Sequence, residues 1–230
     1  MRLDRYIGNA TDLSRSLAQQ KIRRGAVKVN EQVARDPAHT VRAGDRVLLD
    51  GLPVEPVQPR YFMLHKPAGY VCARHDALHP TVMDLLKEPR KGELHPVGRL
   101  DLDTTGLLLV TDDGDWSHRV TSPRKDCPKT YRVVLAEPLQ ASADEALCHG
   151  LMLRGEKRPT RPAAVEMLAP AECRLTIQEG RYHQVKRMMA AVQNRVIVLH
   201  RESIGAIHLD PGLSPGEYRR LNPAEIACVG

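Results

Sequence analysis

The hydrophobic and polar positions of residues 1–50 follow helical spacing at first and then change to short apolar runs. Two helices are expected, over residues 3–7 and 14–24, with Ser14 as a suitable N-cap for the second and Gly25 placed to end it. Short strands are expected at residues 27–29, around Val33 and at residues 47–49, with a turn at residues 30–31. These elements predict a small, compact module.

Residues 51–59 separate this module from the rest of the chain. They include three prolines, at positions 53, 56 and 59. Proline prevents regular helix and favours an extended spacer. The sequence therefore predicts an N-terminal module over residues 1–50, a proline-rich linker over residues 51–59 and a larger domain over residues 60–230.

The larger domain mixes strand-like and helix-like patterns. The stretch 107–110 has no polar alternation and is expected to be a strand buried on both faces. The other elements are strands at residues 61–65, 130–135, 174–178, 196–200 and 204–209, and helices at residues 81–87, 141–147 and 182–192. This order predicts an α+β domain with a mostly antiparallel mixed sheet, beside a small α/β module.

Composition excludes several classes of protein. The 42% hydrophobic content is sufficient for two cores, no stretch approaches a membrane span of roughly 18 apolar residues, and residues 1–25 lack the apolar centre of a signal peptide. Five cysteines without a CxxC pair argue against a disulfide framework and a zinc site, and Pro80 disfavours metal binding by His75 and His79. We expect a cytoplasmic protein without a metal.

Positive charge is concentrated near the start of the chain. The chain has 34 basic and 28 acidic residues, which give a net charge of +6. Residues 1–59 contain 10 basic and 7 acidic residues, so a net charge of +3 lies in about a quarter of the length. This bias indicates a polyanionic partner, although an ordinary solvated surface would also account for it. Either phosphate contact or the helix dipole explains the basic residues at the end of the second helix: Lys21, Arg23, Arg24 and Lys28. Arg15, near the start of this helix, is a further candidate for contact with RNA.

The run from Gly98 to Gly114 places carboxylates just before the buried strand. Asp101 is expected beside the core and within reach of a pocket. The spacing of Asp101, Asp103 and Asp112 approaches that of a calcium loop, but the twelfth position is Asp instead of Glu and flanking helices are missing from the pattern. Turn capping is the structural alternative for the first two carboxylates.

The Gly-Arg-Leu-Asp sequence at residues 98–101 resembles the signature of the pseudouridine synthases. Three more segments resemble the other sequence blocks of that family and occur in the same order along the chain: residues 61–70 (YFMLHKPAGY), 129–133 (KTYRV) and 179–188 (EGRYHQVKRM). The N-terminal module resembles the S4 RNA-binding domain, so the likeness covers nearly the whole chain. It is greatest with the small-subunit ribosomal RNA enzymes, because Tyr182-His183 stands where the large-subunit branch usually has Asn-Arg.

The resemblance implies roles for four residues and no cofactor. Asp101 would act on the ribose, as a nucleophile at C1′ or a base at C2′, and Lys186 would pair with it. Tyr131 would lie against the target base, and Arg99 would fill the gap that the extracted base leaves. Each has a structural alternative: a core aromatic for Tyr131, a snorkelling lysine for Lys186 and a salt bridge for Arg99.

Two patterns in the sequence agree with these roles. Strand alternation places Tyr131 on the inward face, together with Val133 and Leu135. Helical spacing places Lys186 on the flank of an apolar stripe and Arg187 nearly opposite it; the stripe consists of Val185, Met188, Met189 and Val192.

The expected partner is ribosomal RNA of the small subunit, free or in a partly assembled ribonucleoprotein, and the protein is expected to be a monomer without a membrane partner. A large-subunit pseudouridine synthase of the same branch is one alternative function. A non-catalytic S4-type ribosome-assembly protein is the other.

Overall fold

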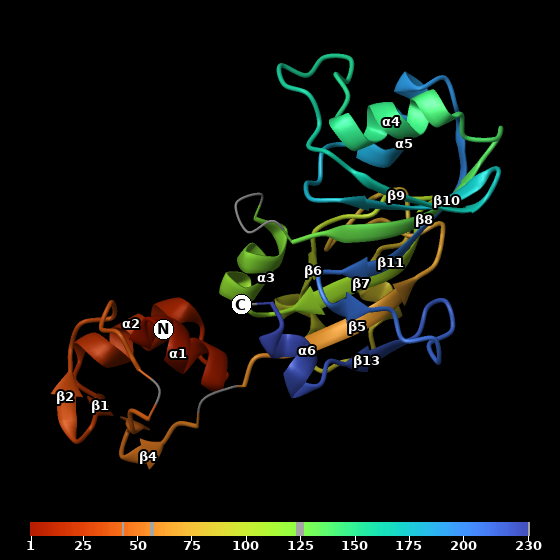
Figure 1. Ribbon diagram of the computed structural model, residues 1–230. Coiled ribbons are helices and arrows are strands. Elements are labelled where there is room, and N and C mark those ends of the chain that lie inside the picture. Colours follow the sequence, from red (N-terminus) through yellow and green to blue (C-terminus); the bar gives the residue numbers. More distant parts are fainter. Residues whose placement is uncertain (43, 56–57, 123–126, 230) are drawn as a thin grey trace. The chain divides into compact units, whose positions relative to one another are not determined.

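The chain folds into two compact units, Met1–Gln58 and Pro59–Gly230, in a computed structural model (Figure 1). The structure describes residues 1–42, 44–55, 58–122 and 127–229. Each unit has a hydrophobic core of its own. None of the helices within these ranges is both long enough and apolar enough to span a membrane.

The first unit packs two helices against a four-stranded antiparallel sheet of order β2-β1-β3-β4. Its elements are α1 (Leu3–Ala10), α2 (Arg15–Arg23), β1 (Val27–Val29), β2 (Gln32–Ala34), β3 (Val47–Leu49) and β4 (Leu52–Pro53). The hydroxyl of Ser14 caps α2 by accepting a hydrogen bond from the amide of Leu17 at 3.3 Å. The helices, the strands and the turn agree with the pattern in the sequence.

The segment expected as a linker partly belongs to this unit. β4 pairs with β3, and Val54, which is 9% exposed, joins the core of the first unit. A strand of two residues at a sheet edge can contain proline, because the proline nitrogen then needs no hydrogen-bond partner. Pro56 and Val57 lie outside the described residues.

The second unit is built on a nine-stranded mixed sheet. Its main path is β13-β5-β7-β11-β8-β10-β9, with β6 paired to β7 and β12 paired to β11. The β7–β11 pair is parallel and the other pairs in the described chain are antiparallel. The strands are β5 (Tyr61–Lys66), β6 (His95–Val97), β7 (Thr105–Thr111), β8 (Lys129–Leu135), β9 (Ala164–Ala169), β10 (Glu172–Ile177), β11 (Val196–Ile204), β12 (Ile207–His208) and β13 (Tyr218–Arg220).

Helices cover both faces of this sheet, as Figure 1 shows. On one face, α4 (Ala141–His149) and α5 (Gln184–Ala191) share a core with β8 and β10. On the other face, α3 (Gly114–Thr121) buries Trp116 and Val120 against β7, close to α6 (Pro223–Ala227). Leu108 faces the first core and Leu107 the second, so β7 is buried on both sides as its sequence predicts.

Several short elements differ from the sequence-based expectation. Residues 81–87 contain a 3-10 helix, η1 (Val82–Leu85), whose start is fixed by a capping box between Thr81 and Asp84. A second short 3-10 helix is η2 (Lys91–Glu93). The strand expected at residues 196–200 extends to Ile204 as β11, and the one expected at residues 204–209 is reduced to β12, which pairs with β11. The patterns missed β6, β9, β13, α3 and α6, most of which are too short for hydrophobic periodicity to develop.

One row of residues across the sheet positions the pocket described below. In the strand register, Lys66 of β5 is opposite Gly106 of β7, Gly106 is opposite Arg201 of β11, and Arg201 is opposite Tyr131 of β8. Gly106 has φ +104°, and a Cβ there would lie 2.3 Å from the Arg201 carbonyl oxygen. A glycine is therefore required where β7 and β11 meet.

Candidate active site

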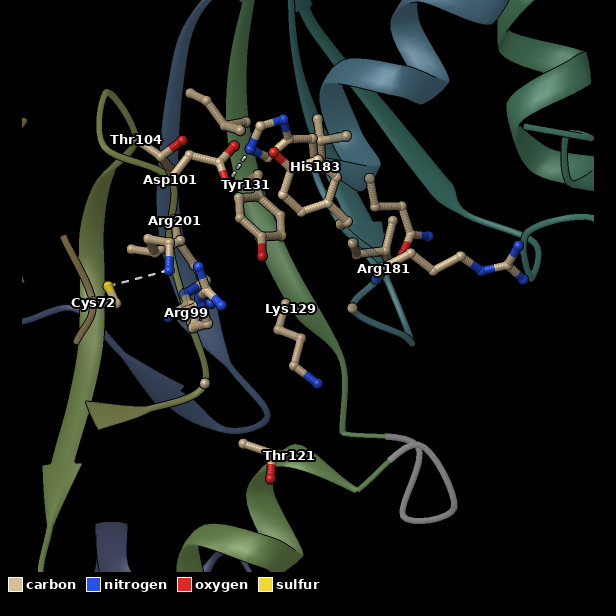
Figure 2. Close-up of a pocket in the computed structure, with 18 of the residues that line it drawn as sticks. Cys72, Arg99, Asp101, Thr104, Thr121, Lys129, Tyr131, Arg181, His183 and Arg201 are labelled. Atoms are coloured by element: carbon tan, nitrogen blue, oxygen red, sulfur yellow. Dashed lines mark hydrogen bonds and ion pairs between the residues drawn. The ribbon is translucent and has the colours of Figure 1, made fainter. Parts of the chain in front are cut away.

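The second unit contains an open pocket of about 710 Å³. Figure 2 shows Asp101 and His183 at one end of it, and Arg99 and Lys129 toward the other end, with Tyr131 between them. The loop before β7, the strands β8 and β11 and the turn before α5 supply the walls. Residues distant in the sequence thus meet around one cavity.

A buried lysine holds the loop that carries Asp101. Lys66 is 0% exposed, and its Nζ donates hydrogen bonds to the carbonyl oxygens of Pro67 (2.9 Å), Leu102 (3.3 Å) and Thr104 (2.8 Å). Burial lowers the pKa of Lys66 from its usual value. Because three carbonyls accept from one ammonium, the loop has a fixed course beside the end of β5.

Asp101 is 25% exposed at the mouth of the pocket and has two basic neighbours. The Nζ of Lys186 lies 3.2 Å from its Oδ2, and the Nε2 of His183 lies 3.4 Å from its Oδ1. Lys186 also donates to Asp103 Oδ1 at 2.6 Å. The resemblance implied a pairing of Lys186 with Asp101, and the two side chains are in contact, but Asp103 is the closer partner of Lys186.

Lys186 and Asp103 affect each other's ionisation. Burial opposes the charged form of Lys186, but the hydrogen bonds to Asp103 and Asp101 outweigh it and raise the pKa of Lys186. The hydrogen bond from Lys186 holds the pKa of Asp103 below its usual value. The charged form of the lysine is therefore favoured next to Asp101.

Tyr131 and Arg201 form the inner wall of the pocket. Tyr131 is 8% exposed and lies on the inward face of β8, as its alternation predicts. The guanidinium carbon of Arg201 is 6.0 Å from the centre of its ring, and Arg201 Nε donates to the carbonyl oxygen of Leu107 at 2.8 Å. The hydroxyl of Tyr131 points away from Asp101 in Figure 2.

Three cations on the pocket wall lack a carboxylate within ion-pair distance among the residues that the structure describes: Arg99, Lys129 and Arg201. Arg99 is exposed, and no described carboxylate lies within ion-pair distance of it, so the salt bridge considered as its structural alternative is not seen among these residues. This side of the pocket is consequently positive, which suits an anionic substrate.

Arg187 faces away from the pocket, as its position on the helix predicts. Its Nη1 lies 2.9 Å from Glu156 Oε1, and its Nη2 donates to the carbonyl oxygen of Arg154 at 2.8 Å. The two adjacent cations of α5 therefore have different surroundings.

The sequence alone assigned no role in the site to four of its residues: Lys66, Cys72, His183 and Arg201. Lys66 and His183 were within the quoted sequence blocks, but their contacts with the Asp101 loop depend on the folded chain. Cys72 accepts a hydrogen bond from the amide of Leu100 at 3.2 Å, and burial raises the pKa of its thiol. Arg201 is 3% exposed, and buried arginines cannot be distinguished from surface ones by sequence pattern.

The basic residues of the first unit fall into two groups. Arg15 lies 3.2 Å from the buried Asp4, and Lys21 pairs with Asp50, so both are engaged within the unit. Hydrogen bonds from Arg2, with further ones from Gln19 and Arg15, hold the pKa of Asp4 well below its usual range. Arg23, Arg24 and Lys28 have exposed side chains.

A metal centre is not evident in the described ranges, where no group of three potential ligands of the His, Cys, Asp or Glu type comes together. The polar groups of the pocket include the carboxylate of Asp101 with its basic neighbours, and three cations that have no carboxylate partner in the described ranges. Together with a separate basic module, this site defines an enzyme that acts on nucleic acid.

Comparisons with known proteins specify this class. Residues 60–191 match the RNA pseudouridylate synthase family and residues 1–47 match the S4 domain. The chain belongs to the RNA pseudouridylate synthase family. This confirms the resemblance inferred from the Gly-Arg-Leu-Asp block and from the N-terminal module.

The similarity extends over the full length. The chain is 52% identical to the ribosomal small subunit pseudouridine synthase A of Salmonella typhimurium, 51% to that of Escherichia coli and 49% to that of Vibrio cholerae. These alignments cover 100% of this chain and 99–100% of the relatives. A crystal structure of a pseudouridylate synthase matches with a TM-score of 0.73 and 45% identity, over 100% of both chains.

Proposed function

We propose that this protein converts a specific uridine of small-subunit ribosomal RNA to pseudouridine. The observation that supports this most strongly is the contact of Asp101 with Lys186 in a pocket whose sequence blocks match the family. Full-length relatives named ribosomal small subunit pseudouridine synthase A support the choice of RNA. We propose that the substrate is free or partly assembled small-subunit RNA and that the enzyme acts in the cytoplasm as a monomer.

The reaction is an isomerisation and needs neither an oxidant nor a cofactor. The bond between ribose C1′ and uracil N1 breaks, the uracil turns, C5 bonds to C1′, and the proton of C5 is replaced by one on N1. Asp101 acts at the ribose, either by attack on C1′ or by removal of the C2′ proton. Lys186 keeps a positive charge beside this carboxylate throughout.

Tyr131 and Arg99 contribute to extraction and binding of the base. A paired uridine is inaccessible, so it must leave the stack before it reaches Asp101. Tyr131 packs against the extracted uracil, and the exposed Arg99 occupies the place that the base vacates. Lys66 acts indirectly, because its hydrogen bonds fix the loop that carries Asp101.

We assign RNA phosphate contacts to the S4-like unit and the chemistry to residues 60–230. Within the former, the exposed Arg23, Arg24 and Lys28 are better placed for phosphates than Arg15 and Lys21, which are paired with carboxylates.

Changing Arg23 and Arg24 together to alanine should weaken RNA binding and make its salt dependence shallower. Loss of two phosphate contacts reduces the slope of log K against log salt by about 1.5. Arg15→Ala is the control. It removes one positive charge, against two in the double variant, and breaks the contact with Asp4, so it should change thermal stability more than the slope. An unchanged slope in the double variant would exclude these contacts.

Mapping pseudouridine in both ribosomal RNAs of a strain that lacks the gene tests the function itself. We expect one small-subunit site to lose its modification and to regain it with the wild-type gene, but not with Asp101→Asn. Loss of a large-subunit site instead would assign the enzyme to the other branch. Unchanged modification in both RNAs would contradict the proposed activity.

A further inference from the structure

Tyr182 is an aromatic residue exposed at the rim of the pocket. Its exposed fraction is 73%, whereas Tyr131 within the same pocket is 8% exposed. A ring that is this accessible contributes little to the hydrophobic core. Its position therefore calls for an explanation other than fold stability.

The ring of Tyr182 is restrained, because another side chain covers one of its faces. Tyr182 stacks on the imidazole of His183 with ring centroids 3.8 Å apart and an interplanar angle of 20°. His183 in turn lies 3.4 Å from Asp101. A single side chain thus separates the exposed ring from the carboxylate that acts on the ribose.

The backbone around Tyr182 is held in place on both sides. Its carbonyl oxygen accepts a hydrogen bond from Arg187 Nη1 at 3.1 Å. The preceding Arg181 donates to the carbonyl oxygens of Arg158 (2.8 Å) and Pro159 (2.6 Å), and to Glu179 (3.1 Å). His183 has φ +47°, a left-handed conformation that is unfavourable for residues other than glycine. This part of the chain therefore maintains a constrained geometry.

We propose that the open face of Tyr182 stacks on the nucleobase next to the extracted uridine. The inference deepens the proposed function and rests on it, because the ribose at Asp101 is covalently linked to the next nucleotide. Extraction of the uridine deprives that neighbouring base of a stacking partner, and an aromatic ring at the rim replaces it. Stacking tolerates any base, so the contact does not depend on its identity.

The arrangement favours the neighbouring base over the extracted uracil as the partner. Tyr131 already presents a ring inside the pocket, whereas Tyr182 lies at its rim, with the stacked His183 covering one face. A ring that is already stacked on His183 also loses little conformational freedom when it binds, and such preorganisation raises affinity. Tyr182 is accordingly assigned to binding, and Asp101 to the chemical step.

The test uses an RNA fragment that contains the uridine mapped in the deletion strain. Equilibrium binding is measured for the wild-type protein, Tyr182→Ala and Tyr182→Phe, with intact RNA and with RNA carrying an abasic ribose immediately before or after the uridine. We expect Tyr182→Ala to bind intact RNA about tenfold more weakly. Tyr182→Phe keeps the ring and should bind within about twofold of the wild type.

The decisive result is non-additivity. An abasic ribose at one of the two positions should weaken binding of the wild type, but should have little further effect in Tyr182→Ala, because both changes remove the same contact. Equal losses in all RNAs, or wild-type affinity of Tyr182→Ala, would overturn the proposal. Because the side chain is exposed, its removal should leave no cavity, and circular dichroism is used to check that the variant is folded.

The outcome is separable from that of the proposed function. A wild-type protein that forms no pseudouridine in ribosomal RNA contradicts the function. A wild-type protein that forms it, together with a Tyr182→Ala variant that binds normally, contradicts only the stacking contact.

Discussion

Replacing Asp101 by asparagine should abolish pseudouridine formation while leaving the fold and RNA affinity nearly unchanged. The amide has almost the same shape as the carboxylate but can neither attack C1′ as an anion nor accept the C2′ proton. A loss of at least about 10³-fold in the single-turnover rate is expected. Saturating enzyme and purified RNA separate this rate from binding.

Asp103→Asn provides the matched control. This carboxylate also contacts Lys186, at 2.6 Å, but its side chain is 71% exposed and it is not assigned to the ribose. It should reduce the rate far less than Asp101→Asn. Turnover by purified Asp101→Asn, or equal losses in the two variants, would contradict the role of Asp101.

Lys186→Met should damage turnover far more than Arg187→Met. Removal of Lys186 leaves Asp101 and Asp103 without the cation that both contact, and like charges in proximity disfavour two ionised carboxylates. The chemical step should slow by about 10²-fold or more, with RNA binding little changed. Single-turnover kinetics at saturating enzyme measure this step directly.

Arg187→Met removes a cation from the same helix, but one that faces Glu156. It should lower RNA affinity modestly at low salt and leave the chemical step largely intact. If Arg187→Met were the inactive variant and Lys186→Met turned over normally, the proposed pairing of Lys186 with Asp101 would be wrong.

Periodicity was informative in the strand and the helix that carry candidate site residues, β8 and α5. Alternation along β8 placed Tyr131 inward, and helical spacing distinguished Lys186 from Arg187. Elements of two or three residues, such as β6 and β13, have no period to detect, and their pairing depends on distant strands. For the same reason, the sequence could not predict that Leu52 and Pro53 add a strand to the first sheet.

The site was predictable to the extent that its residues belong to recognisable blocks. Asp101, Tyr131, Lys186 and Arg99 could be named. The structure places Asp101, Tyr131 and Arg99 in the lining of one pocket and Lys186 in contact with Asp101. Lys66 and Arg201 could not, because burial of a charged side chain is a property of the packed structure. Lys66 donates hydrogen bonds to carbonyl groups that lie 36 and 38 positions away from it in the sequence.

The order of the strands has a consequence for how the polypeptide assembles as it leaves the ribosome. β11, which lies between β7 and β8, is made after both of them, from residues 196–204. The two parts of the sheet cannot join before then, so Asp101 and Tyr131 are synthesised long before the strand that connects their supports. Closure of this domain therefore waits for one late, non-local insertion, which is the kind of step that makes folding slow.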